Sequence, residues 1–514
     1  MSINKSIAKS AGLIGFATLC SRLLGFFRDI IIARLFGIYV YSQAFVIAFK
    51  IPNLFRDFVG EGAANAAFVP VFSEYTVKHT KEEFWELANV MLNLLLVTLT
   101  SITILGVIFA PAIVRLIAPG FVDDPHKLET TITLTRAIFP YILLIGLTAY
   151  AVAILNSLKH FVVPAFAPCL LNISIIVFAL IFGENIKGLA LGVLVGGVLQ
   201  LAAQIPVLYK KGFRLRLFRS FQHPAAKTIR KLMIPRIVSS SIYQLNNFVD
   251  SIFGSLAAIV GEGGVSVLYF SYRLILFPVG IFSNAITQAI LPTLSTQALE
   301  QNTDKLKHTF SWGLRSTFLV MLPTSVVFMV LALPIISTLF GGGKFDLNSA
   351  RLTADALFFY SIGLFAYGST KIVQSCFFAL KDTLTPTKIA ALTLVMNIIL
   401  NPLLMFPLKI SGIALANSIS GIVTFFILFF LLKKRLGEFP VREIIVSFLR
   451  ILAASLLMGV VCYLASRVIP NKIFSLIFAL TCGLVSYILF CFILRVSEMR
   501  QLWQWLAKKE KITD

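Results

Sequence analysis

The sequence predicts an all-α polytopic membrane protein with about 14 transmembrane helices. The 514-residue chain is 58% hydrophobic and only 13% charged, and its mean hydropathy is +0.89. A soluble domain of this size could not cover so much apolar surface with polar side chains. Apolar runs of about 20 residues, the length that crosses a membrane, recur from one end of the chain to the other.

Charged residues, prolines and glycines separate the apolar runs and set the limits of the predicted spans. These limits are 11–36, 39–58, 86–117, 132–157, 162–182, 187–208, 232–259, 264–290, 309–340, 353–378, 386–407, 410–432, 444–468 and 473–495. The stretch 62–75 is expected to form a short amphipathic connector. Lys5 and Lys9 precede the first apolar run as in a signal peptide, but no small-residue cleavage site follows, so we expect a retained helix.

The charges of the loops predict which side of the membrane each loop faces. The loops after the sixth and twelfth spans are strongly basic. Their basic residues are Lys210, Lys211, Arg214, Arg216, Arg219, Lys227, Arg230, Lys231, Lys433, Lys434 and Arg435. Because cytoplasmic loops are enriched in Lys and Arg, we expect these loops and both termini to lie in the cytoplasm. Such flanks account for the net charge of +22, so no nucleic-acid partner is expected.

Four pairs of short segments recur in order at a nearly constant spacing. They are 69–75 with 291–297, 145–150 with 362–367, 171–173 with 396–398, and 188–197 with 412–421. The period covers six spans, so both repeats have the same orientation, as in secondary transporters built from parallel repeats. The predicted organisation is an N-terminal lobe at 1–210, a basic cytoplasmic linker at 211–230, a C-terminal lobe at 231–435, and two further spans with a cytoplasmic tail at 436–514.

No pattern of catalytic or metal-binding residues is present in the sequence. The five histidines form no HExxH motif, and the six cysteines lie in apolar runs without the spacing of metal ligands. The run GGGKF at 341–345 lacks the first glycine and the Ser or Thr of a phosphate-binding P-loop. We therefore expect a protein that is not an enzyme and that holds no cofactor and no metal.

Ionisable residues inside the predicted spans are the most informative feature. In the N-terminal lobe they are Arg22, Arg28, Asp29, Arg34, Lys50, Arg56, Asp57 and Arg136, with Glu61 just beyond a span. In the C-terminal lobe they are Arg236, Asp250, Arg273, Asp355 and Lys371. Charges at membrane depth are costly, so they usually face a protein interior or a water-filled cavity.

Some of these charges have a simpler structural explanation. Arg34 and Lys50 lie near span ends, where long side chains can extend to the membrane surface. Asp29 and Asp57 each follow an arginine directly and can serve as its local charge partner.

Three arginines are harder to explain in this way. Arg28, Arg56 and Arg273 are flanked by apolar residues within spans or at their ends, which favours a role in a cavity. The balance of the intramembrane charges is positive and indicates an anionic substrate. The planar guanidinium, with its fork of donors, suits phosphate or pyrophosphate best.

Several blocks of the sequence resemble the MurJ (MviN) lipid II flippase family, which belongs to the MOP superfamily. The blocks are SRLLGFFRDIIIARLFG (21–37), FKIPNLFRDFVGEGAANAAFVPVFSEY (49–75), APGF (118–121), FPYILLIGL (139–147), AILNSLKHFVVPAFAPCLLNI (153–173), GGVLQL (196–201), YFSYRLILFPVGIFSNAITQAILPTLS (269–295), GKF (343–345) and ALKDTLTPTKIA (379–390). They follow one another in order through both predicted lobes.

The resemblance implies two six-helix lobes around a central cavity, with the last two helices forming a groove for a lipid tail. It implies movement of lipid II, an undecaprenyl-pyrophosphate-linked disaccharide-pentapeptide, from the inner to the outer leaflet of the bacterial inner membrane for peptidoglycan synthesis. The family's cavity arginines correspond to Arg22, Arg28, Arg56 and Arg273. We expect supporting or gating roles for Asp29, Lys50, Asn53, Glu61 and Asp250. Membrane lipids and the cell-wall synthesis machinery are further candidate partners.

Two positions depart from the pattern of some relatives, which carry an acid where this chain has Gln43 and Tyr272. A proton-coupling role at residue 43 is therefore in doubt.

Among rival functions, a MATE-like cation or drug antiporter would need an acidic cavity, and another polyprenyl-linked saccharide flippase would share the basic one. A scaffold for cell-wall enzymes would need no intramembrane arginines, and a membrane-embedded enzyme would need an acid/base pair.

Overall fold

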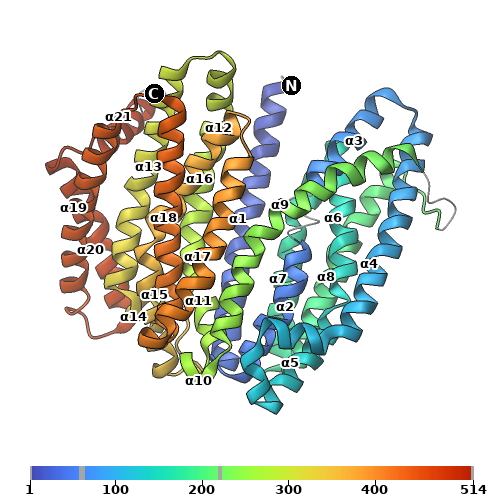
Figure 1. Ribbon diagram of the computed structural model, residues 1–514, viewed down its shortest axis with the longest axis horizontal. Helices are drawn as coiled ribbons and strands as arrows, with labels where there is room; N and C mark the ends of the chain where they lie inside the picture. The colour runs from blue at the N-terminus through green and yellow to red at the C-terminus, as the bar shows by residue number, and fades with distance from the viewer. Residues whose placement is uncertain (1–2, 57–63, 218–222, 511–514) are drawn as a thin grey trace. The chain divides into compact units, whose positions relative to one another are not determined.

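The computed structural model describes residues 3–56, 64–217 and 223–510, and within these ranges the protein is built of helices without an extended strand (Figure 1). The predicted all-α class is confirmed. The chain divides into two compact units. The first unit comprises Met1–Ser266 and Gly343–Phe345, and the second comprises Val267–Gly342 and Asp346–Asp514.

Among the described residues, eleven helical elements lie in the first unit up to Val260. They are α1 (Ile3–Phe36), α2 (Val40–Arg56), α3 (Ala64–Lys78), α4 (Lys81–Ile117), the 3₁₀ turn η2 (Pro119–Asp123), α5 (Pro125–Ile138), α6 (Tyr141–Ser157), α7 (Val162–Phe182), α8 (Lys187–Lys211), α9 (Pro224–Gly254) and α10 (Ala257–Val260). The predicted connector at 62–75 corresponds to α3, whose described part is helical from residue 64.

The helices from α11 onward belong to the second unit, apart from the first residues of α11. They are α11 (Gly264–Pro278), the π-helical turn η3 (Val279–Ser283), α12 (Asn284–Leu299), α13 (Thr303–Val330), α14 (Ala332–Leu339), α15 (Leu347–Ile362), α16 (Leu364–Ala379), α17 (Leu384–Leu408), α18 (Ile410–Leu436), α19 (Val441–Ala465), α20 (Lys472–Ile493) and α21 (Ser497–Glu510).

Ten helices in the described residues are long and apolar enough to cross a membrane, or eleven if the bent pair α15 and α16 forms one span. The helices α1, α2 and α9 are not among them, although each coincides with a predicted span. These three helices carry most of the intramembrane charges singled out above, and the described part of α2 is only 17 residues long. The count of about 14 spans therefore remains a prediction.

Helix α9 packs against α3 and α4 and belongs to the first unit. The sequence-based division instead placed residues from 231 onward in the C-terminal lobe. The two compact units group residues by their contacts in space, whereas the predicted lobes group residues by the internal repeat of the sequence. The lobe boundaries at 210 and 231 thus stay a prediction.

Local sequence explains where several helices begin or break. Thr80 starts α4 with a capping box, in which its hydroxyl accepts from the Glu83 N–H at 3.3 Å while the Glu83 carboxylate accepts from the Thr80 N–H at 3.1 Å. Pro140 separates α5 from α6, and Pro278 immediately precedes the π-helical turn η3. Proline removes a backbone donor, so such breaks are expected at these positions.

Glycines allow α7 and α8 to approach closely. A Cβ atom built on Gly192 would lie 2.9 Å from the Ile175 Cα, and one on Gly196 would lie 3.0 Å from the Leu171 Cα. Small residues at helix contacts are typical of membrane proteins, where close backbone packing replaces the hydrophobic driving force. This contact fixes α7, the helix that carries a central residue of the candidate site.

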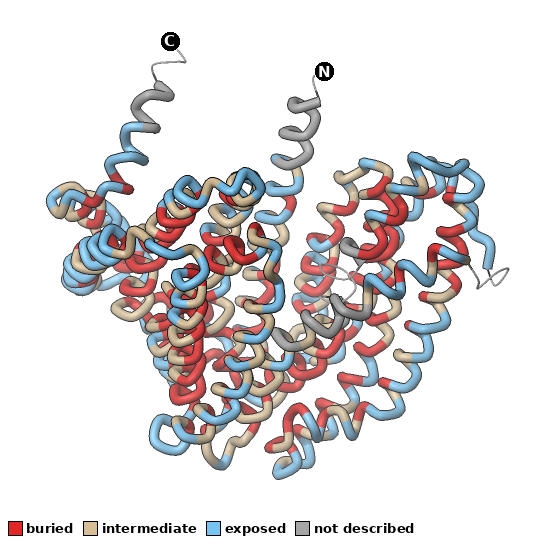
Figure 2. Tube along the Cα trace, turned by 45° about the horizontal axis from the view of Figure 1, so that its top comes forward, coloured by how far each residue is buried: buried red, intermediate tan, exposed pale blue. Residues whose placement is uncertain are grey.

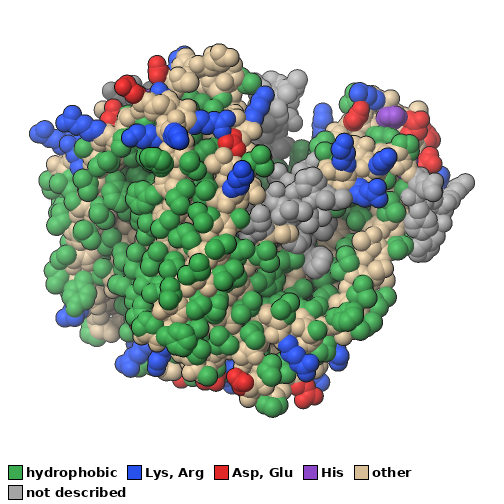
Figure 3. Space-filling model, in the orientation of Figure 1, with side chains coloured by type: hydrophobic (Ala, Val, Ile, Leu, Met, Phe, Trp, Pro, Cys, Tyr) green, Lys and Arg blue, Asp and Glu red, His purple; other side chains and the backbone are tan. Residues whose placement is uncertain are grey.

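The exposed faces of the helices are apolar. Buried and exposed residues alternate along single helices in Figure 2, as expected for helices that pack on one side only. Over the second unit, Figure 3 shows hydrophobic side chains along the middle of the helices and Lys and Arg at their ends. Together with the apolar helices, this pattern identifies a multi-pass membrane protein.

Candidate functional site

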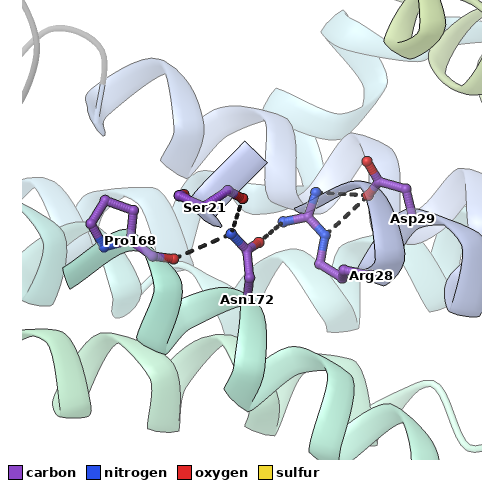
Figure 4. A network of polar contacts seen from close by, with 5 residues as sticks. All are labelled: Ser21, Arg28, Asp29, Pro168 and Asn172. Carbon is purple, nitrogen blue, oxygen red and sulfur yellow. Dashed lines mark hydrogen bonds and ion pairs between the residues drawn. The ribbon is translucent and has the colours of Figure 1, made fainter. Parts of the chain in front are cut away.

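Arg28 and Asp29 form a buried ion pair within α1. The exposed fraction is 6% for Arg28 and 0% for Asp29. The guanidinium donates from Nε to the Asp29 Oδ1 at 3.0 Å and from Nη2 to the same oxygen at 2.7 Å (Figure 4). Asp29 is therefore the local charge partner of Arg28 in this conformation.

Asn172 on α7 supplies the third contact to the guanidinium. Its Oδ1 accepts from the Arg28 Nη1 at 3.1 Å. Its Nδ2 donates to the carbonyl oxygens of Ser21 and Pro168, both at 3.2 Å. Because both carbonyls require the amide nitrogen, they fix the orientation of the amide and turn its oxygen toward Arg28. Figure 4 shows these groups converging from α1 and α7.

An aromatic ring covers the remaining side of the guanidinium. The Arg28 Cζ lies 5.6 Å from the centroid of the Phe49 ring on α2, within the range of a cation–π contact. Phe49 stacks on Phe45 with centroids 5.4 Å apart and also approaches Tyr141 on α6. Arg28 is thus held by contacts from α1, α2 and α7, all within the first unit.

Lys50 forms a second polar link, between α2 and α9. Its Nζ donates to the backbone carbonyl of Asn247 and to the hydroxyl of Ser251. The Phe248 ring centroid lies 5.7 Å from Nζ, and Asp250 acts on Lys50 electrostatically. Lys50, for which we expected a gating or supporting role, thus links α2 to α9, the helix that also carries Asp250.

The other predicted site residues that the structure describes lie on α1, α2 and α11. Arg22 is half-buried in α1, and the buried Asn53 Oδ1 on α2 has no hydrogen-bond partner within the described residues. Arg56 ends α2, but its side chain and the whole of Glu61 lie outside the described residues. Arg273 is half-buried in α11 of the second unit. Its participation with the arginines of the first unit remains a prediction.

The second unit has a polar contact of its own around the π-helical turn. Lys371 on α16 donates to the Asn284 Oδ1 at 2.6 Å. Asn284 follows η3 directly, and a Cβ on Gly368 would lie 2.6 Å from the Ser283 Oγ. The ammonium of Lys371 therefore donates a hydrogen bond to a neutral amide at the start of α12, beside an irregular turn of a type that is frequent at functional sites.

Sequence reasoning did not select Asn172 or Phe49 as site residues. Asn172 appeared only as part of an internal repeat, although a lone asparagine in an apolar helix is itself a signal of a buried polar contact. Phe49 carried no signal, since phenylalanine is common in membrane helices. Among the described residues, no three His, Cys, Asp or Glu side chains come together as a metal site would require.

Comparison with known proteins supports one family over nearly the whole chain. Residues 32–484 match the family described as "Lipid II flippase MurJ". A "Probable lipid II flippase MurJ" from Buchnera aphidicola subsp. Acyrthosiphon pisum is 35% identical over 95% of this chain and 97% of its own length. The "Lipid II flippase MurJ" of Burkholderia cenocepacia is 34% identical over 81% of this chain and 82% of its own length.

Solved structures agree with the sequence relatives. A structure of "Lipid II flippase MurJ, inward closed conformation" aligns with a TM-score of 0.82 and 28% identity, over 94% of this chain and 98% of that one. An inward-facing MATE transporter of the MOP superfamily aligns with a TM-score of 0.70 at 16% identity, over 81% of this chain and 94% of that chain, and so shares the fold. The chain therefore belongs to the lipid II flippase MurJ family.

Proposed function

We propose that the protein moves lipid II from the inner to the outer leaflet of the bacterial inner membrane by alternating access, and thereby supplies peptidoglycan synthesis. The single observation that carries the proposal is its membership of the flippase family over most of its length. The buried arginine of α1 adds the chemistry, because a guanidinium is the side chain best suited to a pyrophosphate.

The Arg28–Asp29 pair defines what an anionic substrate must do to bind. In the conformation described, Asp29 and Asn172 accept three hydrogen bonds from the guanidinium of Arg28, one from each of its nitrogens. We propose that a pyrophosphate takes the place of the Asp29 carboxylate on Arg28, and that Asp29 displaces the anion again on release.

We assign pyrophosphate binding also to Arg22, Arg56 and Arg273, as the family correspondence suggests. Lys50 and Asp250 would act as a gating or supporting pair, since Lys50 links α2 to α9. Asn53 and Glu61 are assigned supporting roles. The contacts of Arg28 and Lys50 support this assignment, because each charge is held by side chains or carbonyls from a different helix.

Transport requires no covalent chemistry from the protein, and we propose that it is not an enzyme. Both termini and the basic loops would face the cytoplasm, as their Lys and Arg content indicates. Membrane lipids and lipid II are its proposed ligands, and the cell-wall synthesis machinery is a proposed partner. A MATE-like antiporter is the second candidate on fold alone, but the site built around Arg28 favours an anion over a cation.

Depletion of the protein in cells tests the proposal directly. Lipid II would be probed with an externally added enzyme that cleaves its headgroup, in intact cells before and after depletion. Flippase activity predicts that lipid II becomes protected once the protein is depleted. If lipid II stays fully accessible from outside, the proposed function is wrong.

Substitution of the arginines tests the site. Arg28→Ala, Arg56→Ala and Arg273→Ala should each fail to restore growth of depleted cells at normal expression levels. Arg115→Ala is a matched control, because Arg115 is an exposed residue in the last turn of α4. Full complementation by all three site variants would contradict the assignment.

A further inference from the structure

A small cavity lies in the second unit where α13, α19 and the first turn of α21 meet. Its volume is about 180 Å³. Six of its lining residues are polar: Arg315, Glu443, Ser447, Arg450, Ser497 and Glu498. A cavity of this size has room for several water molecules or for the polar end of a ligand.

An ion pair in the wall of the cavity is almost fully buried. The exposed fraction of the side chain is 11% for Arg315 and 3% for Glu498, and the Arg315 Nη1 lies 3.2 Å from the Glu498 Oε1. A second carboxylate oxygen, the Glu443 Oε2, lies 3.7 Å from the same nitrogen. Arg450 lies at the mouth, where its Nη1 donates to the backbone carbonyl of Arg495 at 3.1 Å.

Several buried polar atoms of the wall lack a hydrogen-bond partner within the part of the chain that the structure describes. They are both carboxylate oxygens of Glu498, the Arg315 Nε and the Ser447 Oγ. Buried polar groups are almost always hydrogen-bonded, whereas the carboxylate of Glu498, although ion-paired with Arg315, has oxygens that accept no hydrogen bond from the described residues. A ligand that both donates and accepts hydrogen bonds would satisfy these atoms.

The charges of the wall select the type of ligand. Two guanidinium groups, of Arg315 and Arg450, face the cavity together with two carboxylates, of Glu443 and Glu498. The carboxylates would repel a simple anion, and the guanidinium groups would repel a simple cation. A zwitterion with an acidic and an amino group separated by a few bonds can pair with both.

The surroundings of the cavity indicate that the ligand is a lipid. Val446 belongs to the wall, and the adjacent Ile445 and Leu449 of α19 are more than half exposed. Trp312, one turn before Arg315 on α13, is also exposed. An exposed tryptophan beside an apolar face and a cluster of charges is typical of the membrane–water interface. Acyl chains could lie along this face while the headgroup enters the cavity.

We propose that this cavity binds the headgroup of phosphatidylethanolamine. The phosphate pairs with Arg315 and Arg450, and the ammonium donates to Glu498 and Glu443. A primary ammonium is preferred over a quaternary one, because its N–H groups can donate to the oxygens of Glu498 while its charge pairs with the carboxylate. The site concerns a resident lipid rather than the transported one and does not depend on the proposed transport function.

Native mass spectrometry of the purified full-length protein with added lipids tests the proposal. Phosphatidylethanolamine should bind about tenfold more tightly than phosphatidylcholine, whose methylated nitrogen cannot donate hydrogen bonds to the carboxylates. It should also bind more tightly than phosphatidylglycerol, which has no amino group. Soluble phosphoethanolamine should compete only weakly, because it lacks the acyl chains that contact α19.

Three variants locate the binding. The double variant Arg315→Gln/Glu498→Gln removes both buried charges together, and Arg450→Gln removes an exposed charge together with one hydrogen bond to the Arg495 carbonyl. Both should reduce the preference for phosphatidylethanolamine about tenfold. Glu438→Gln, at an exposed acid just before α19 that lies outside this cavity, should leave it unchanged.

Each other outcome overturns the proposal. Equal binding of phosphatidylethanolamine and phosphatidylcholine would exclude the role of the carboxylates, and a preference for phosphatidylglycerol would indicate an anion site. Equal competition by phosphoethanolamine would exclude a membrane lipid as the source. A preference for phosphatidylethanolamine that survives in Arg450→Gln and in the double variant would place its site elsewhere. If the double variant fails to fold, Arg450→Gln and the lipid series decide.

Discussion

Arg28 donates two hydrogen bonds to the carboxylate of Asp29, the residue that follows it in the same helix. Adjacent residues on an α-helix point about 100° apart, so this pairing takes the guanidinium sideways around α1. The two charges thereby neutralise each other at a position where neither could be solvated. Their association is the property of the site that mutation can test most directly.

Asp29→Asn should lower the stability of the protein, because it leaves the buried guanidinium of Arg28 without a counter-charge. Breaking one side of a buried ion pair costs about 3 kcal/mol or more. Thermal unfolding in detergent would measure the loss. Asp124→Asn is a suitable control for the change of residue type, since Asp124 only caps α5. An unchanged unfolding temperature for Asp29→Asn would contradict the structural importance of the pair.

The same variant should bind an anionic ligand more tightly if Asp29 competes for Arg28. Asp29→Asn is then expected to increase the affinity for undecaprenyl pyrophosphate while impairing transport, since release loses its competing carboxylate. Native mass spectrometry of the variant and of the wild type would give the ratio of affinities. Weaker binding by the variant would show that Asp29 orients Arg28 for the ligand rather than competing with it.

Asn172→Ala removes two hydrogen bonds that join α7 to α1, to Arg28 and to the Ser21 carbonyl, and a third to the Pro168 carbonyl within α7. The bond to a charged group alone is worth about 1.5–3 kcal/mol. We therefore expect a lower unfolding temperature and a loss of complementation. Asn185→Ala, in the exposed turn before α8, is the matched control. If both variants complement equally, the amide of Asn172 has no role in positioning Arg28.

Much of the fold follows from the sequence, because length and apolar character identify most membrane helices without knowledge of their packing. The charges of α1, α2 and α9 were visible in the sequence as well. Their partners were not, since the contact between Arg28 and Asn172 joins residues that are far apart in the chain. Neither did any local pattern reveal that Lys50 reaches Asn247 and Ser251. Such contacts arise only once the helices pack.

Lys50→Met keeps the length of the side chain and removes its three donors. It should weaken the link between α2 and α9, and the loss is expected to be about 1.5–3 kcal/mol for hydrogen bonds from a charged group. Hydrogen exchange of residues 244–254 would report the effect as faster exchange in the variant. Lys187→Met, at an exposed position at the start of α8, should leave these residues unaffected. Equal protection in both variants would exclude a role for Lys50 in holding α9.

Gly192→Ala should destabilise the contact between α7 and α8. The added Cβ would lie 2.9 Å from the Ile175 Cα and 3.1 Å from the Phe178 Cβ, so a backbone has to move. Gly15→Ala is the control, because a Cβ there meets nothing within 4 Å and alanine favours the helix by about 0.5–1 kcal/mol. Unfolding temperatures should therefore change in opposite directions. A shift in the same direction for both would contradict close packing at Gly192.

Asp382, in the loop between α16 and α17, should give the protein a stability that depends on pH. Burial raises the pKa of Asp382, but hydrogen bonds from the N–H and hydroxyl of Thr385, together with Arg435, outweigh it and hold the pKa below its ordinary value of 3.8. A lowered pKa stabilises the folded state above the unfolded value, and the contribution is lost as the pH falls through the folded value.

Asp382→Asn should therefore cost about 1 kcal/mol at pH 7, the size of a helix-terminal cap and a partly exposed ion pair. The difference between variant and wild type should persist down to about pH 4 and shrink below that, because the wild-type carboxylate then becomes protonated. Unfolding temperatures measured at pH 7 and at pH 3 would give both values. If the difference is the same at the two pH values, the contribution of Asp382 to stability does not depend on its negative charge.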